Sequence, residues 1–208
     1  MPDLRQLPAG RAGRLWLRRR LAVARRGVDL LDHQLRILRV EHERLRLLVA
    51  QTGPVWRDRC QEAERWLLRG AIVGGQREIR LTTATAPAEV AVTVAEVMGV
   101  RYPDRVTVTL PRPPPSVRPA ASAGLVLAVD AYGAALQAAV RHAAAEAALS
   151  IVEAQVAEVS RRKRAISQRW VPRLESALHD LSQRLEDQER DEMVRRHWVA
   201  ELQDGAVR

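Results

Sequence analysis

Few side chains in this sequence have a type and spacing suited to catalysis or metal binding. Cys60 is the only cysteine, so no disulfide or cysteine-based zinc site can form within one chain. A P-loop needs a lysine behind a glycine-rich turn, but Lys163 is the only lysine and has no glycine nearby. No two of the histidines have the spacing of a shared metal site: His33, His42, His142, His179 and His197. The sequence therefore predicts no cofactor, no metal and no enzymatic activity.

The charged residues are more typical of exposed helix faces than of a reactive site. The net charge is +9, from 34 basic and 25 acidic residues, which suits an acidic protein, an anionic surface or nucleic acid as partner. The acidic cluster at residues 186–192 is interspersed with arginines and indicates a paired, solvated face. The basic run at 161–164 could contact phosphates, but no aromatic platform accompanies it, so nucleic acid is not the favoured partner.

The composition points to long helices. Of 208 residues, 47% are apolar but only 3% are aromatic, and phenylalanine is absent. Aromatic rings normally contribute much of a globular core. A chain rich in Ala, Leu, Arg and Glu is typical of extended helical proteins.

Residues 11–69 form the first predicted segment, a coiled-coil helix. Apolar positions recur at alternating steps of four and three, the pattern of a coiled-coil seam. We expect a kink or short break at Gly53–Pro54, because proline disfavours a helical residue before it. Gly27 lies within the seam region, and close packing of two helices is its simplest explanation. The predicted seam residues are Leu17, Leu21, Ala24, Val28, Leu31, Leu35, Leu38, His42, Leu45 and Val49.

Residues 70–119 form a small strand-rich head with a proline-rich linker. The β-branched runs at 79–83, 90–94 and 106–110 are strand candidates. Turns are expected at Pro87 and at residues 102–104. Prolines from 111 to 119 predict a stiff, extended linker.

Residues 125–199 form the second long helix, followed by a tail at 200–208. The alternation of three and four is broken by a run of fours near Pro172, a stutter that unwinds a coiled coil locally. The apolar stretch 119–140 consists mainly of small residues, so no membrane insertion is expected. The seam residues here are Leu149, Val152, Val156, Val159, Lys163, Ile166, Trp170, Leu174, Leu178, Leu181 and Leu185.

The fold expected from this order is mostly α. It is a long antiparallel two-helix coiled coil, made by the N- and C-terminal helices, with a small head that contains a β-hairpin inserted between them. A compact helical bundle is the alternative. In the antiparallel pairing, we expect Leu35 and Leu38 to face the region 174–185.

Three motifs resemble the D-subunit family of V-type and archaeal-type (V/A) rotary ATPases. Residues 20–31 read RLAVARRGVDLL, like the N-terminal helix signature of the family. Residues 97–103 read VMGVRYP, like its short element between the helices. Three C-terminal stretches follow its pattern in order: RRKRA at 161–165, VPRLE at 171–175 and LEDQERDE at 185–192. The motif residues are Arg20, Gly27, Met98, Gly99, Pro103, Arg162, Pro172, Arg173, Glu189 and Arg190.

The resemblance implies a non-catalytic central rotor shaft, cytoplasmic and peripheral to the cell membrane. Its expected partners are the catalytic A and B subunits of the ATPase ring, the small F subunit of the stalk, and the funnel-shaped C/d-type subunit on the membrane rotor ring. The shaft would couple ATP hydrolysis or synthesis to proton or sodium ion transport. The alternative is a free-standing coiled-coil adaptor or nucleic-acid-binding scaffold.

Overall fold

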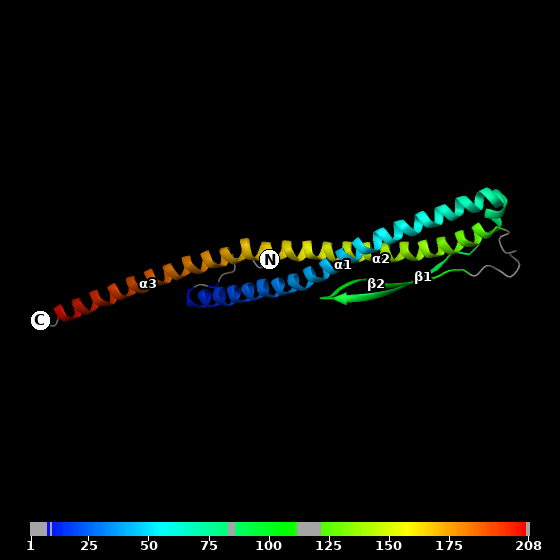
Figure 1. The fold of residues 1–208 in the computed structure, drawn as a ribbon. Helices are drawn as coiled ribbons and strands as arrows, with labels where there is room; N and C mark the ends of the chain where they lie inside the picture. The colour runs from blue at the N-terminus through cyan, green and yellow to red at the C-terminus, as the bar shows by residue number, and fades with distance from the viewer. Residues whose placement is uncertain (1–7, 9, 83–85, 112–121, 207–208) are drawn as a thin grey trace. The chain divides into compact units, whose positions relative to one another are not determined.

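The computed structural model describes residues 8, 10–82, 86–111 and 122–206, with side chains as far as residue 199. Its elements follow the order α1 (Gly10–Thr82), β1 (Glu89–Val97), β2 (Val100–Thr109), α2 (Ala123–Ala165), a π-helix η2 (Ile166–Trp170) and α3 (Val171–Ala206) (Figure 1). The mostly α fold class is confirmed: two long helical parts flank a two-stranded hairpin.

The chain divides into two compact units. The terminal unit comprises Met1–Gln34 and Glu158–Arg208, and the central unit comprises Leu35–Ala157. This division cuts across both long helical parts. The four segments expected from the sequence, 11–69, 70–119, 125–199 and 200–208, therefore remain a proposal about domain organisation.

The terminal unit is held by an apolar seam between the first part of α1 and the helix that returns through η2 and α3. Leu17, Leu21 and Ala24 form a buried cluster with Leu174. Ion pairs along this seam join rising residue numbers on α1 to falling numbers on the returning helix, so the two helices are antiparallel. The residues that pack around the cluster are Trp16, Ile166, Trp170, Val171, Ala177, Leu178 and Leu181.

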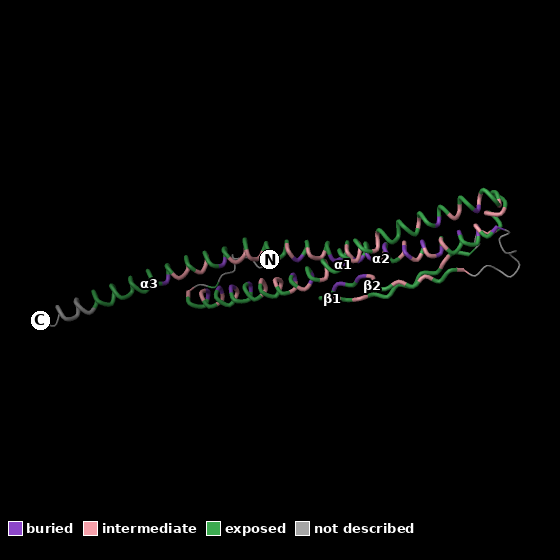
Figure 2. The backbone as a smooth tube through the Cα atoms, viewed as in Figure 1, coloured by how far each residue is buried: buried purple, intermediate pink, exposed green. Residues whose placement is uncertain are grey.

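The central unit repeats the antiparallel pairing with smaller side chains. Leu45 of α1 packs with Ala148 and Val152 of α2, and Gly70 lies against Leu125. Buried and exposed positions alternate along both helices (Figure 2), as expected for a stripe of contact rather than a wide core. The buried residues of α2 are mainly alanines: Ala128, Ala135, Ala138, Ala145 and Ala148.

Two glycines allow the helix backbones of the central unit to touch. A Cβ atom built on Gly124 would lie 3.1 Å from both Cα and N of Gly70. A Cβ built on Gly70 would lie 2.7 Å from Leu125 Cδ2, closer than real side chains allow. Glycine suits this level because a Cβ at Gly70 or Gly124 would require Leu125 or the facing backbone to move.

The hairpin turns at Met98 and Gly99, within the family-like stretch. Val97 pairs with Val100, and both loop residues have positive φ angles, 52° and 81°. A two-residue hairpin loop with this backbone matches the twist of antiparallel strands, and glycine adopts it without a steric penalty. The turn expected at residues 102–104 is wrong.

Pro103 instead lies inside β2, at an irregularity in strand pairing. Val94 pairs with Pro103 while Thr93 pairs with Arg105, so Asp104 is an extra residue in the ladder. A bulge accommodates proline because proline has no N–H to donate. Sequence reasoning mistook a bulge for a turn, since both use the same residue types.

The first helix is longer and more continuous than expected. α1 runs through Pro54 and ends at Thr82; inside the helix, after its first residue, the backbone angles are non-helical at Gly75, where the helix is kinked. The break expected at Gly53–Pro54 is therefore wrong, as is the strand at 79–83 as far as Thr82, which is helical. The strands expected at 90–94 and 106–110 fall within β1 and β2, apart from Leu110. The proline-rich linker, beyond Pro111, lies outside the described residues.

The stutter near Pro172 coincides with the π-helix η2. The Val171 N–H donates to the Ile166 carbonyl, a π-type hydrogen bond. A π-helix accommodates extra residues per turn, which is how a seam absorbs a run of fours without losing its face.

The register differs from the one expected for Leu35 and Leu38. Leu174 packs on Leu17, Leu21 and Ala24, and Lys163 pairs with Asp32. The expectation that Leu35 and Leu38 face residues 174–185 is wrong. Gly70 lies against Leu125 near the start of α2, and counting back along both helices from this contact places Leu174 at the level of Leu17 to Ala24 rather than at that of Leu35 and Leu38.

Leu45 and Leu47 provide a matched test of the seam. Leu45 is 1% exposed and Leu47 is 53% exposed, on the same helix two residues apart. Leu45→Ala should lower the free energy of unfolding by about 2–5 kcal/mol, because it leaves a cavity. Leu47→Ala should change it by about 0.5 kcal/mol or less. Urea denaturation followed by circular dichroism measures both, and equal losses would contradict the seam.

Candidate functional site

Every residue of the predicted seam is at least half-buried, and about half of them are buried. The buried members are Leu17, Leu21, Ala24, Leu35, Leu38, Leu45, Val152, Val159, Leu174 and Leu185. The half-buried members are Val28, Leu31, His42, Val49, Leu149, Val156, Lys163, Ile166, Trp170, Leu178 and Leu181.

The family-like residues are dispersed rather than gathered into one pocket. Arg20 lies over the ring of Trp16, 4.9 Å from its centroid, and Arg190 pairs with Asp187 at 2.9 Å. Arg162, Pro172 and Arg173 are exposed. The distribution favours contact along an extended surface over chemistry at one point.

Ion pairs cross between the helices on one flank of the terminal seam. Arg25 Nη2 lies 2.7 Å from Glu175 Oε1, and Lys163 Nζ lies 2.5 Å from Asp32 Oδ1. Arg11 Nη2 lies 2.8 Å from Glu189 Oε1. Exposed pairs of this kind contribute about 0–1 kcal/mol each, so their main effect is to favour one register of the two helices.

A polar latch fixes the hairpin to α1 in the central unit. The Tyr102 hydroxyl, on β2, donates to Glu41 Oε1 at 2.8 Å. Arg44 Nη2 donates to the same oxygen at 2.6 Å and lies 3.8 Å from Asp104 Oδ1. The Tyr102 ring is 3% exposed and belongs to the buried cluster around Leu45. The latch therefore joins a buried ring to a charged hydrogen bond at its edge.

The latch shifts the pKa values of its members, and its hydrogen bond to Glu41 raises the pKa of Arg44. The hydrogen bond from Arg44 lowers the pKa of Glu41, against the opposing effect of burial. Burial raises the pKa of Tyr102, and its hydrogen bond to the Glu41 carboxylate raises it further. At neutral pH the carboxylate is charged and the phenol is protonated, which is the pair that this hydrogen bond requires.

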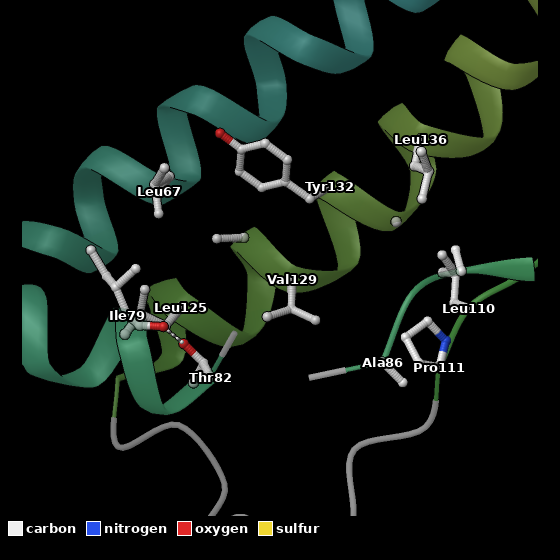
Figure 3. A pocket seen from close by; sticks show the side chains of 13 residues that line it. Leu67, Ile79, Thr82, Ala86, Leu110, Pro111, Leu125, Val129, Tyr132 and Leu136 are labelled. Atoms are coloured by element: carbon white, nitrogen blue, oxygen red, sulfur yellow. Dashed lines mark hydrogen bonds between the residues drawn. The ribbon is translucent and has the colours of Figure 1, made fainter. Parts of the chain in front are cut away.

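A cavity of about 530 Å³ lies where the base of the hairpin approaches the two helices of the central unit (Figure 3). Its wall is apolar apart from the hydroxyls of Thr82 and Tyr132. Leu110 lies close to Gly133, whose Cβ would be 2.8 Å from Leu110 Cδ1. The hairpin thus packs on α2 at its base and on both helices near its turn, which fixes its direction along the helix pair.

His142 is a buried polar residue that sequence reasoning treated only as a helix-face histidine. It is 8% exposed, its Nδ1 lies 3.0 Å from Thr52 Oγ1, and its ring stacks on Trp56. A Cβ on Gly53 would lie 3.3 Å from its ring. In the sequence, His142 stands out as a single histidine within a run of alanines. In the structure it faces the Gly53–Pro54 pair of α1.

This contact also explains why α1 continues through Pro54. Gly53 has no Cβ to clash with the proline ring, so it can remain helical. Thr52 Oγ1 also lies 2.9 Å from the Leu48 carbonyl oxygen. The helix is thus supported by α2 and by its own side chains at the point where proline removes a backbone donor.

Gly27 has no packing explanation within the described chain. A Cβ placed on it would meet nothing within 4 Å. The expectation that it allows close approach of the two helices is therefore wrong. Glycine within a helix costs about 1 kcal/mol relative to alanine, and Gly27 carries this cost without an internal contact that would compensate for it.

The described residues contain no group of three or more His, Cys, Asp or Glu side chains placed to hold a metal ion. By length and composition alone, one helical stretch, Ala123–Val199, could cross a membrane; 28% of its most apolar window is buried. A single helix of this kind is weak evidence for a membrane span.

Comparison with protein families agrees with this arrangement. Residues 15–201 match the family model of the ATP synthase D subunit. The chain belongs to the ATP synthase D-subunit family. It is therefore a stalk subunit of a rotary ATPase and acts within that complex together with other subunits. A search of curated proteins found no match.

The latch of this D-subunit chain gives a pH-dependent prediction. Tyr102→Phe should lower the free energy of unfolding by about 1–3 kcal/mol at pH 7, because it removes a hydrogen bond to a charged group. Because folding raises the pKa of Tyr102, the protonated phenol stabilises the folded state fully at pH values below its ordinary pKa of 10.0. This stabilisation is lost as the pH rises through the pKa of the folded protein. Because folding lowers the pKa of Glu41, its carboxylate stabilises the folded state fully at pH values above its ordinary pKa of 4.5. This stabilisation is lost as the pH falls through the pKa of the folded protein.

The difference between wild type and Tyr102→Phe should therefore be largest near neutrality and shrink toward both extremes. Urea denaturation across the pH range measures it. Tyr132→Phe is the control, since Tyr132 is 43% exposed. A difference that does not change with pH would contradict the latch.

Proposed function

We propose that this chain is the non-catalytic central rotor shaft of a V/A-type rotary ATPase. It couples ATP hydrolysis or synthesis in the A/B catalytic ring to proton or sodium ion transport. The observation that carries the proposal is the continuous pairing of antiparallel helices within each unit, in a chain of the D-subunit family. A paired seam resists twisting and separation, which a single helix in water does not.

The exposed side chains support the proposed partners. In the central unit, Leu68, Ile72 and Val73 of α1 are 66%, 85% and 78% exposed. Apolar residues exposed together suit a protein interface. We assign this part of the chain to the funnel-shaped subunit on the membrane rotor ring, the rest of the central unit to the F subunit, and the terminal unit to the A and B subunits. The complex then lies in the cytoplasm, peripheral to the cell membrane.

A rotation experiment tests the shaft. The chain is assembled with A, B and F subunits, the ring is fixed to a surface, and a bead is attached to the chain. Leu174 is 0% exposed. Leu174→Asp should therefore stop ATP-driven rotation, because an unpaired charge at this buried position would separate the two helices. Ser176→Asp, two residues further on the exposed surface, should leave rotation intact.

Nucleotide binding by the A/B ring alone should be unaffected, since the chain supplies no catalytic group. Failure of the wild-type chain to assemble with the ring would contradict the proposal. In that case, DNA binding with a steep dependence on salt would favour the nucleic-acid scaffold instead.

Cysteine crosslinking tests the pairing within one chain. Asp32→Cys and Lys163→Cys, combined in a Cys60→Ser background, should be joined inside the monomer by a short bis-maleimide, because the ion pair between the native side chains shows that these positions face each other in the terminal unit. Mobility on a denaturing gel reports the product. A crosslinked dimer in place of the internal bond would show that the helices pair between chains, as in a free-standing adaptor.

A further inference from the structure

A weak step in α1 lies opposite a buried histidine of α2. The step consists of Gly53 and Pro54, which are both poor helix formers, and Pro54 has no N–H to donate to the carbonyl four residues before it. The helix nevertheless runs through the step. A Cβ on Gly53 would lie 3.3 Å from the His142 ring, which stacks on Trp56 with the ring centroids 5.4 Å apart. One turn of α1 thus packs around an ionisable side chain that is 8% exposed.

The hydrogen bonds around His142 are all present only when both ring nitrogens carry a proton. Thr52 Oγ1 has a single hydrogen and lies 2.9 Å from the Leu48 carbonyl oxygen, to which it donates. The same Oγ1 lies 3.0 Å from His142 Nδ1, so Nδ1 must be the donor in that contact. On the other side of the ring, Nε2 lies 3.4 Å from Glu146 Oε1, one turn further along α2. A carboxylate only accepts, so this contact needs a proton on Nε2 as well.

A neutral His142 loses one of these bonds in either of its two forms. With its single proton on Nδ1, the bare Nε2 faces the Glu146 carboxylate without a hydrogen between them. With the proton on Nε2, the Thr52 hydroxyl must turn to donate to Nδ1, and its bond to the α1 backbone is lost. The charged ring keeps all three bonds, and the face of Trp56 also attracts a cation. Loss of the second proton therefore weakens either the bond that orients the ring or the bond that supports α1 beside Pro54.

Charged groups surround this contact on all three elements of the central unit. On α1, Arg57 Nε lies 3.5 Å from the carbonyl oxygen at position 53. Arg141 of α2, with Asp104 and Arg105 of β2, lines a hollow of about 350 Å³ against the same turn of α1. The three arginines are exposed, so water screens their repulsion of a charged ring. Glu146 contacts the ring directly and attracts its positive charge.

We propose that His142 is a proton-dependent pin, a side chain that holds the weak step of α1 while its ring is charged. With the ring neutral, this turn of α1 opens more often, while the buried side chains of Leu45 and Ala63 keep the helix paired on either side of it. Histidine gains and loses its second proton between about pH 5 and 8. The stiffness of the central unit therefore responds to pH in this range, a property that goes beyond the stalk function and does not depend on it.

Amide hydrogen exchange of the full chain tests the pin. Glu146→Gln removes the charge but keeps the size of a side chain that is 61% exposed, so the fold should be retained. At pH 5.5, peptides that cover residues 53–60 should exchange roughly two- to fivefold faster in the variant than in the wild type, because the charged bond to the ring is lost. At pH 8 the two proteins should exchange at the same rate. Each comparison is made at a single pH, so the intrinsic pH dependence of exchange cancels.

Glu153→Gln is the matched control, since Glu153 is exposed two turns further along α2. It should exchange like the wild type at both pH values. In a His142→Gln background, Glu146→Gln should have no effect at either pH, because the side chain at position 142 no longer titrates. Equal exchange of the wild type and Glu146→Gln at pH 5.5 would overturn the pin. An acceleration of the same size at pH 8 would also overturn it, since the effect would then not depend on the proton.

Discussion

The fold depends on a stripe of contact between antiparallel helices, since a helix pair has no other interior. In the terminal unit the stripe is made of large side chains, with Leu174 buried among Leu17, Leu21 and Ala24. In the central unit alanines take their place along α2, and at Gly70 and Gly124 the backbones meet directly. Each helix exposes the greater part of its circumference, so the stability of the fold depends on few buried positions. Leucine, valine and alanine fill those positions, so the chain can fold with few aromatic residues.

The hairpin depends on the paired helices for its stability. A two-stranded sheet alone is marginal in water, and β1 and β2 have no third strand among the described residues. Their stability comes from the helices: Tyr102 joins the buried cluster of Leu45, while its hydroxyl donates to Glu41. A change in the helix pairing at this level would therefore release the hairpin as well. The latch couples the two without requiring a large area of contact.

Sequence periodicity predicted the long helices and the class of fold, because a 3.5-residue apolar repeat favours paired helices in water. It failed where a local signal was overruled by contact with distant residues. Pro54 did not break α1, since Gly53 lies against His142 and Thr52 supports the helix. The β-branched run at Ile79 became helix, and the turn signal at Pro103 became a bulge. The register expected for Leu35 was also wrong, because it is set by a contact distant in the sequence, where Gly70 meets Gly124 and Leu125.

Most of the irregular positions in the helices are compensated by a contact or by continued alignment of the buried face. Gly70 gains close approach of two helices, and Gly53 makes room for the ring of His142. The π-helix before Pro172 keeps the seam in phase. Gly27 alone among these gains nothing from the described residues around it. Within a stalk subunit, a cost that the isolated chain does not recover is most simply recovered in the complex.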